Sequence, residues 1–263
     1  MLVAAANSLV RVLLEPSCAA CGTPHERPLA GPLCADCRAG VVRLSAPMCV
    51  VCGEPLASSR TAGPLCARCD ARRPSFQIAR SVGRYEGSLR EIIHAFKYRR
   101  RRALAEPLAS WLAEAGADLL DAADAVVPVP LHPRRRLERG FNQADDLARL
   151  LGRPVWRVIR RVRHGRPQAG LAGRARRANV YGAFGPASWW GAAAPRLRAR
   201  PLRNAVVVLI DDVMTTGATL DACSRALLDA GVRRVGALTV ARSASAPPAR
   251  PPQPRRLWAA PHR

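Results

Sequence analysis

Lysine is nearly absent from this chain: Lys97 is the only one, and arginine supplies the other 41 of the 42 basic residues. Acidic residues are also scarce, since Asp and Glu together number 19, and the formal net charge is +23. A surface this positive attracts polyanions such as nucleic acids through phosphate contacts that weaken with salt. A compositional bias of the genome toward arginine would give the same excess, and the sequence leaves both explanations open.

Long apolar runs are missing as well. No run approaches the roughly 20 residues that a membrane-spanning helix needs. Residues 2–14 are apolar, but they lack a basic start and are interrupted by Asn7 and Arg11. They therefore predict a short helix rather than an export signal. We expect a soluble, cytoplasmic protein.

Two common nucleotide-binding signatures are absent. The chain contains neither G-x-x-x-x-G-K-[ST] nor G-x-G-x-x-G, so a P-loop and a dinucleotide fingerprint are excluded. A different phosphate-binding pattern is present in residues 206–219. It begins with five apolar residues, four of them β-branched, as is typical of a strand buried on both faces of a parallel sheet.

Chemistry-bearing residues follow this predicted strand directly. Asp211 and Asp212 can only accept hydrogen bonds when ionised, so they suit sugar hydroxyls rather than phosphate oxygens. The next residues form a small loop whose amides and hydroxyls can donate to one phosphate group: Thr215, Thr216, Gly217, Ala218 and Thr219. A helical pattern then runs from Leu220 and closes at Gly231. This order of strand, acidic pair, loop and helix predicts a sugar-phosphate site. The alternative is an ordinary strand-turn-helix with solvated aspartates.

Eight of the nine cysteines fall in Cys-x-x-Cys pairs within an internal repeat between residues 18 and 69. Each unit has a Cys-x-x-Cys-Gly knuckle, a loop and a second pair. This spacing is typical of structural zinc, and four protein ligands leave no open position for a substrate. The tandem repeat favours two zinc ions with sequential ligand sets, although an interleaved pairing stays open: Cys18, Cys21, Cys34 and Cys37, then Cys49, Cys52, Cys66 and Cys69.

The stretch from residue 206 resembles the phosphoribosyl pyrophosphate (PRPP) signature of type I phosphoribosyltransferases. Other motifs resemble the ComF (competence protein F) family, and the likeness extends from about residue 18 to residue 242. These motifs are Tyr85-Glu86-Gly87, His94-Ala95-Phe96-Lys97-Tyr98, Leu131-His132-Pro133-Arg134 and Arg139-Gly140-Phe141-Asn142-Gln143-Ala144.

The resemblance implies PRPP as ligand, usually with Mg²⁺. It implies that Asp211 and Asp212 are the catalytic acids that hold the ribose, and that Val213 and Met214 belong to the PRPP site with the phosphate loop. On the pyrophosphate side it implies Lys97, Leu131, His132, Arg134 and Arg139. Residues 160–179 resemble the hood that closes over PRPP in this fold.

The predicted fold class is α/β: a Rossmann-like type I phosphoribosyltransferase domain with a parallel sheet, preceded by a small Cys-rich double zinc ribbon. The expected domains are an N-terminal helix (1–17), a tandem zinc-ribbon module (18–72), a phosphoribosyltransferase-like domain (76–242) and a Pro/Arg-rich tail (243–263) without fixed structure. Within the large domain we expect strands at 76–85, 125–130, 155–159, 206–210 and 232–240, helices at 89–98, 104–115 and 142–151, a basic loop at 131–140 and an insertion at 185–203.

Two functions follow from these observations. The first is a phosphoribosyltransferase whose acceptor substrate the sequence does not identify. The second, which the family's link to DNA uptake implies, is an accessory protein that binds single-stranded DNA or DNA-uptake or helicase partner proteins. In that case PRPP would be a regulatory ligand.

Overall fold

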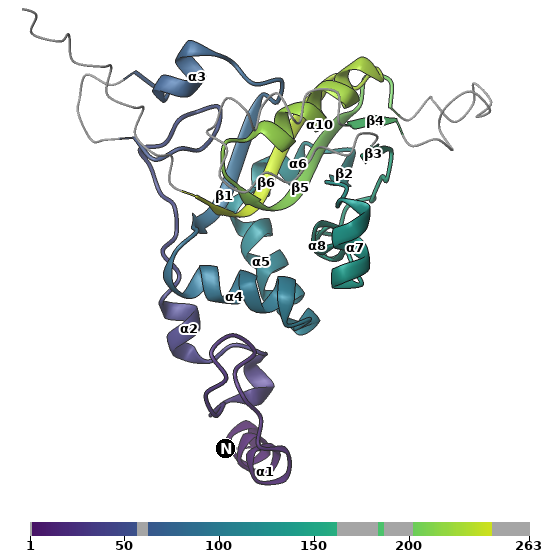
Figure 1. Ribbon diagram of the computed structural model, residues 1–263. Coiled ribbons are helices and arrows are strands. Elements are labelled where there is room, and N and C mark those ends of the chain that lie inside the picture. Colours follow the sequence, from purple (N-terminus) through teal and green to yellow (C-terminus); the bar gives the residue numbers. More distant parts are fainter. Residues whose placement is uncertain (1, 57–62, 162–183, 187–201, 244–263) are drawn as a thin grey trace, which may run out of the picture.

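The computed structural model describes residues 2–56, 63–161, 184–186 and 202–243 (Figure 1). Its centre is a sheet with helices on both faces, and the Cys-rich segment packs against the core around that sheet. Predictions that concern residues 162–183, 187–201 and 244–263 lie outside the described residues. They include nearly all of the expected hood, insertion and tail.

The central sheet has four parallel strands in the order β1-β6-β5-β2. Their bounds are β1 Ile78–Arg84, β2 Ala125–Pro128, β5 Val206–Met214 and β6 Arg234–Arg242. Because all four strands run the same way, their carboxyl ends lie at one edge, where such sheets bind ligands. The predicted α/β class with a parallel sheet is confirmed.

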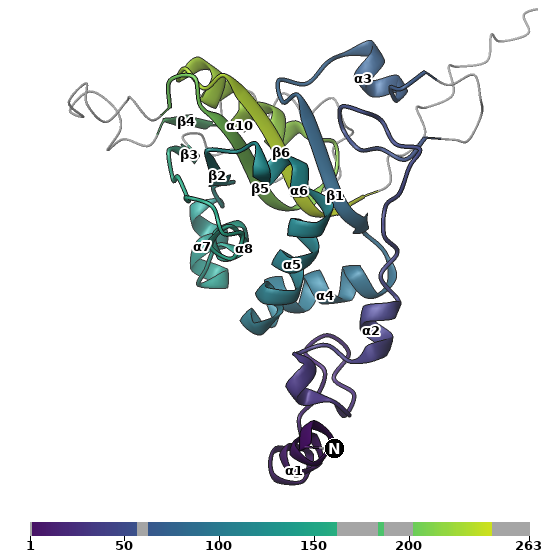
Figure 2. The same ribbon diagram turned by 180° about the vertical axis from the view of Figure 1, so that it is seen from behind.

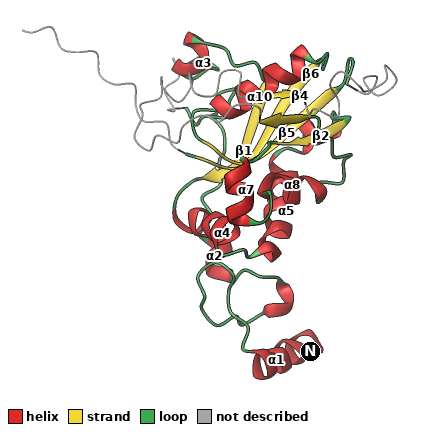
Figure 3. Ribbon diagram, turned by 45° about the vertical axis from the view of Figure 1, so that its right-hand side comes forward, coloured by secondary structure: helices red, strands yellow, loops and turns green. Residues whose placement is uncertain are grey.

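The apolar run of β5 is buried on both faces, as its composition predicts. Val208 and Ile210 belong to a core formed with α4 (Gly87–Tyr98), α5 (Ala105–Ala115) and α8 (Gln143–Arg149). Val207 and Leu209 belong to a second core that contains the buried side of α10 (Ala218–Asp229). Figure 3 shows these helices on the two sides of the strands. The alternation follows from the two-residue period of a strand.

The remaining elements lie outside the four-stranded sheet, and all of them except α1 are short. In the N-terminal part they are α1 Leu2–Leu14, η1 Pro28–Ala30, α2 Ala35–Ala39 and α3 Ala67–Ala71. In the large domain they are η2 Arg102–Leu104, α6 Ala117–Asp121 and α7 Pro133–Arg139, with β3 Ile159–Arg161 and β4 Phe184–Pro186. Within the described ranges no helix has both the length and the apolar character required to cross a membrane.

Two sequence predictions about the segment between β2 and β4 are wrong. Residues 131–140 were expected to be a loop, but Pro133 to Arg139 form helix α7. Proline suits the first position of a helix, because its fixed φ is helical and its missing amide hydrogen is not needed there. Residues 155–159 were expected to be one strand, but only Val155 makes a bridge, to Val126, before the short antiparallel pair β3–β4 begins.

The two cysteine units lie in different places. The first unit and α1 project away from the sheet beyond α2, on the side of α4 (Figure 1). The Arg99 side chain at the end of α4 donates to the Ala20 carbonyl of this unit, at 3.2 Å. The second unit lies beside the sheet edge formed by β1, where the Ala79 amide donates to the Val51 carbonyl at 2.6 Å (Figure 2).

Candidate functional site

The acidic pair lies in the carboxyl-terminal part of β5, which continues to Met214 instead of ending before the aspartates. Asp211 pairs in register with Thr239 of β6, and β2 ends opposite Ile210. The Asp212 amide donates to Asp211 Oδ1 at 2.8 Å, which fixes the direction of the Asp211 carboxylate. Both aspartates therefore lie at the carboxyl edge of the sheet.

Lys97, the chain's one lysine, lies against this pair. It comes from the last turn of α4, and its Nζ is 2.6 Å from Asp212 Oδ1. The side chains of Lys97 and Asp212 are only 11% and 15% exposed. A cation in this position offsets the repulsion between the two neighbouring carboxylates. The acidic pair therefore has its counter-charge from a residue that lies 115 positions earlier in the chain than Asp212.

The pKa of Asp211 is raised to about 7, from an ordinary value of 3.8. Loss of water around its carboxyl group is the largest cause, although the residue keeps partial contact with solvent. The charge of Asp212 raises the pKa further, and the charges of Lys97 and Arg139 lower it. Asp211 is thus a carboxyl group that changes charge near neutral pH, which is a frequent property of functional sites.

Arg139 is a buried cation whose charge acts on Asp211. It is the last residue of α7, and its guanidinium donates to Gln143 Oε1 at 3.1 Å and to the Tyr98 hydroxyl at 3.2 Å. Its Cζ also lies 4.9 Å from the centre of the Tyr98 ring. Tyr98 and Gln143 therefore fix the direction of Arg139. Their role was not assigned from the sequence, which only showed them within motifs.

The predicted phosphate loop, Thr215 to Thr219, connects β5 to α10 and includes the first residues of that helix. Gly217 caps the helix with a left-handed φ of 77°, and a Cβ atom there would lie 2.8 Å from Met214 Cε. The Ala218 amide is 3.4 Å from Thr216 Oγ1, and the Asp221 amide donates to the Gly217 carbonyl at 2.8 Å. The loop turns sharply into a twelve-residue helix whose amino end favours an anion.

The other predicted pyrophosphate-side residues follow β2. Leu131 and His132 are half-buried and lie between this strand and α7. Arg134 belongs to α7, and its side chain lies outside the described residues. The contact of these residues with pyrophosphate stays a prediction.

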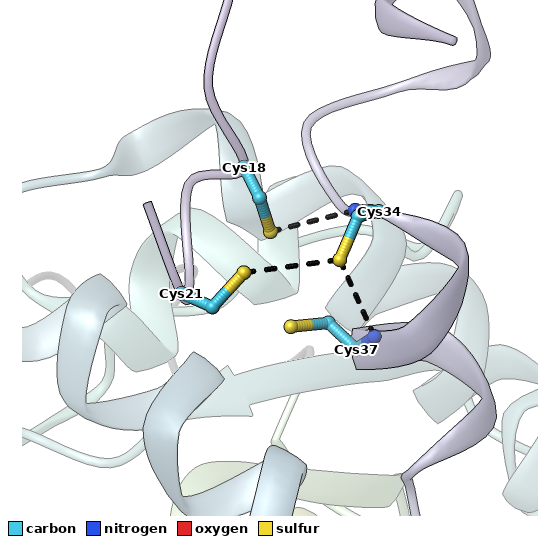
Figure 4. Close-up of side chains that lie close together, drawn as sticks. All are labelled: Cys18, Cys21, Cys34 and Cys37. Atoms are coloured by element: carbon cyan, nitrogen blue, oxygen red, sulfur yellow. Dashed lines mark hydrogen bonds between the residues drawn. The ribbon is translucent and has the colours of Figure 1, made fainter. Parts of the chain in front are cut away.

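The eight paired cysteines form two four-thiol groups in the sequential arrangement. Within each group all sulfur atoms lie within 4.8 Å of one another, and in the first group they converge on a common centre (Figure 4). The distance from Cys21 Sγ to Cys34 Sγ is 3.8 Å, and that from Cys52 Sγ to Cys66 Sγ is 3.5 Å. Tetrahedral zinc with bonds of about 2.3 Å places its sulfur ligands about 3.8 Å apart, so both groups fit zinc.

Two arginines connect the second four-thiol group with the phosphate loop. Arg242, the last residue of β6, is 2% exposed and bonds to Cys52 and to Met214. Arg68 lies between two cysteines of the group, and its Nη1 is 3.4 Å from the Thr216 carbonyl oxygen. Neither residue could be identified from the sequence, because nothing there distinguishes the two from the other arginines.

Two family models match parts of this chain. Residues 9–72 match a family model described as "Double zinc ribbon domain", and residues 137–256 match one described as "Phosphoribosyl transferase domain". A hypoxanthine phosphoribosyltransferase structure from Staphylococcus aureus aligns with a TM-score of 0.31 and 16% identity, over 52% of this chain and 64% of that one.

Two curated relatives match most of the chain. Competence protein F of Haemophilus influenzae is 32% identical over 80% of this chain and 90% of its own length. The DNA utilization protein YhgH of Salmonella typhimurium is 34% identical over 79% of this chain and 87% of its own length. The chain therefore belongs to the ComF (competence protein F) family, with a structural zinc-ribbon segment joined to a phosphoribosyltransferase domain.

Proposed function

We propose that this protein binds PRPP at the carboxyl edge of its sheet and acts as a phosphoribosyltransferase on an acceptor still to be identified. One observation carries the proposal: the acidic pair, with Lys97 on Asp212, lies directly before a phosphate loop and the amino end of α10. A ligand that matches this order has hydroxyl groups next to a phosphate, as a ribose 5-phosphate does.

Each part of the proposed ligand has a counterpart in the site. Asp211 and Asp212 accept hydrogen bonds from the ribose hydroxyls. Residues 213–219 surround the 5′-phosphate, with the hydroxyls of Thr215, Thr216 and Thr219 as further donors. Gly217 lets the backbone approach the phosphate because no side chain intervenes.

The pyrophosphate side is assigned to the cations and the segment after β2. Arg139, held by Gln143 and Tyr98, offers a guanidinium in a fixed direction. Leu131, His132 and Arg134 belong to the same side by their place in the chain, and Lys97 contributes its charge next to Asp212. Mg²⁺ would arrive with PRPP and offset the charge of its pyrophosphate.

The chemistry follows from this placement. An acceptor nucleophile forms a bond to the anomeric carbon of the ribose while the bond from that carbon to pyrophosphate breaks. The ring carries positive charge as this happens, and the leaving pyrophosphate gains negative charge. The site contributes by orienting the ribose with Asp211 and Asp212 and by stabilising the leaving group with Arg139.

Calorimetric titration of PRPP with Mg²⁺ into the zinc-loaded protein tests the proposal. The Asp211→Asn, Asp212→Asn double variant should bind at least about tenfold more weakly, because hydrogen bonds to charged groups are among the stronger ones. Asp229→Asn, which removes an exposed charge at the far end of α10, should bind like the wild type. Absence of PRPP binding to the wild type, or equal binding to the double variant, would contradict the proposal.

A second function is favoured by the net charge of +23. The relatives are named for competence and DNA utilization. On that basis we propose that the protein acts in DNA handling, with single-stranded DNA or a DNA-uptake or helicase protein as partner and PRPP as regulator. A cytoplasmic location fits the reduced thiols that zinc requires.

The second function has its own test. Affinity for a fluorescent single-stranded oligonucleotide should fall by about 10³-fold or more between 50 and 200 mM salt if several arginines contact phosphates. It should also change when PRPP is added. Salt-independent binding, or no binding at 50 mM salt, would contradict the DNA-handling function.

A further inference from the structure

Arg242 connects the second four-thiol group with the phosphate loop. This guanidinium is almost fully buried, and it is surrounded by acceptors from the zinc-ribbon segment. Its Nη1 donates to the Cys52 carbonyl at 2.6 Å, its Nη2 lies 3.4 Å from Cys52 Sγ, and its Nε donates to Glu54 Oε2 at 2.7 Å. A buried charge without such partners would cost several kcal/mol, so these acceptors hold Arg242 in place.

The same guanidinium contacts the start of the phosphate loop. Arg242 Nη1 lies 3.1 Å from Met214 Sδ, and the next residue, Ser243, donates its amide to the Met214 carbonyl at 3.0 Å. Met214 in turn packs at Gly217, where its Cε would lie 2.8 Å from an added Cβ. One chain of contacts therefore leads from Cys52 through Arg242 and Met214 to the glycine of the loop.

Arg68 supplies a second connection. It lies between Cys66 and Cys69 in the first turn of α3, and its guanidinium reaches the Thr216 carbonyl. A pocket between the two parts is lined on one side by Cys52, Arg68 and Cys69 and on the other by Met214, Thr216 and Gly217. Zinc on both flanking cysteines would fix the backbone from which Arg68 extends.

The first four-thiol group has a different neighbourhood. Cys18, Cys37 and the adjoining Leu33 pack into the core that contains α4 and α5. The position that corresponds to Arg68 is Asp36. Helix α2 of this unit contacts α4, and Arg99 at the end of α4 donates to the Ala20 carbonyl. The two groups have the same ligand pattern but different structural neighbours.

We propose that the zinc ion of the second group, held by Cys49, Cys52, Cys66 and Cys69, positions the phosphate loop through Arg242 and Arg68. The ion of the first group then supports the α4 side and has no such effect. The ligand that benefits is PRPP if the proposed function holds, but the order of the loop can be measured without any ligand. Arg242 and Arg68 are positioning residues in this proposal.

Paired cysteine variants test the proposal in the full chain. Cys69→Ser and Cys37→Ser replace equivalent residues of the two groups, and each should lower the zinc content from two ions to one. Amide hydrogen exchange in peptides covering residues 214–219 should become about tenfold faster in Cys69→Ser and stay unchanged in Cys37→Ser. Equal exchange rates in the two variants would overturn the proposal.

Arginine variants that leave all zinc ligands intact separate loop positioning from folding. Arg68→Gln should keep two zinc ions and still accelerate exchange in residues 214–219, by about threefold for the loss of one hydrogen bond. Arg242→Lys should have a larger effect, because one ammonium group cannot replace both the Nη1 contacts with Cys52 and Met214 and the Nε contact with Glu54. Arg38→Gln, in the corresponding helix of the first group, is the control and should leave the loop unchanged. Unchanged exchange in Arg68→Gln with both ions bound would also overturn the proposal.

PRPP titration of the same variants distinguishes this proposal from the proposed function. If the wild type binds PRPP, Cys69→Ser should weaken binding about tenfold and Cys37→Ser should not. If the wild type binds no PRPP but loop exchange responds only to Cys69→Ser, the zinc-to-loop coupling stands and the proposed function fails. If PRPP binds equally to all variants, the proposed function stands and the coupling fails.

Discussion

Replacing Asp211 by Asn should stabilise the protein at alkaline pH while it weakens the proposed PRPP site. The pKa of Asp211 is raised to about 7 in the folded protein, so the folded state binds a proton here more tightly than the unfolded state does. The stability that the wild type gains from this proton is therefore fully present below the pKa that Asp211 has in the unfolded state. This stability is lost as the pH rises through 7. Asn cannot ionise, so the variant does not have this loss.

The magnitude follows from the pKa shift. One pKa unit corresponds to about 1.4 kcal/mol. Without screening by solvent, the raised pKa lowers the free energy of unfolding of the wild type by about 2 kcal/mol between pH 5.5 and pH 8.5. Partial contact of Asp211 with solvent reduces this value, so we expect the stability of the variant relative to the wild type to rise by about 1–2 kcal/mol over that interval. Asn also keeps an oxygen that can accept from the Asp212 amide, as Asp211 Oδ1 does at 2.8 Å.

Thermal and urea unfolding of the zinc-loaded proteins at several pH values between 5.5 and 8.5 measure this difference. The zinc thiolates also respond to pH, but they are the same in both proteins and cancel when the two are subtracted. Asp118→Asn, an exposed aspartate of α6, controls for the loss of one negative charge. A stability difference that does not change with pH, or that falls as the pH rises, would refute the assignment of a raised pKa to Asp211.

Three further predictions concern the ion pair, the loop and the metal. Lys97→Met should lower the free energy of unfolding by about 3 kcal/mol, because it leaves the largely buried Asp212 carboxylate without its cation, and urea unfolding measures this. Gly217→Ala should cost about 1–2 kcal/mol in the same assay, since φ is 77° and the new Cβ would meet Met214 Cε. Gly152→Ala is its control, with φ of 66° and nothing within 4 Å of the added atom, and should cost less. Metal analysis should find two zinc ions per chain, and their removal by a chelator should lower the unfolding temperature; one ion or none would contradict the double ribbon.

Features that depend on neighbouring residues could be predicted from the sequence. Five apolar residues in a row are enough to require burial on both faces, and β5 indeed packs against a core on each side. The spacing of the cysteines likewise determines which thiols can meet, because a Cys-x-x-Cys turn points two sulfur atoms in one direction. These patterns gave the parallel sheet and the two four-thiol groups.

Contacts between distant segments could not be predicted in the same way. Cys52 and Arg242 are separated by 190 residues, and 41 arginines compete for any such role in a sequence-based argument. The wrong prediction for residues 131–140 has a related cause. A run of basic residues was interpreted as a loop, although arginine is a good helix former and Pro133 is well placed to start α7.

The repeat itself illustrates how similar sequences acquire different structural roles. Gly22 and Gly53 occupy the same position in the two knuckles, and both have a left-handed φ, of 79° and 66°. A Cβ at Gly22 would meet nothing within 4 Å, whereas a Cβ at Gly53 would lie 2.8 Å from the Ala79 carbonyl oxygen of β1. The knuckle sequence thus requires glycine for its own turn in both units, but only the second unit also requires it for close packing on the sheet. Because β1 pairs with β6, and β6 ends at Arg242, this packing holds the second unit in the register at which Arg242 can reach Cys52 and Met214 together.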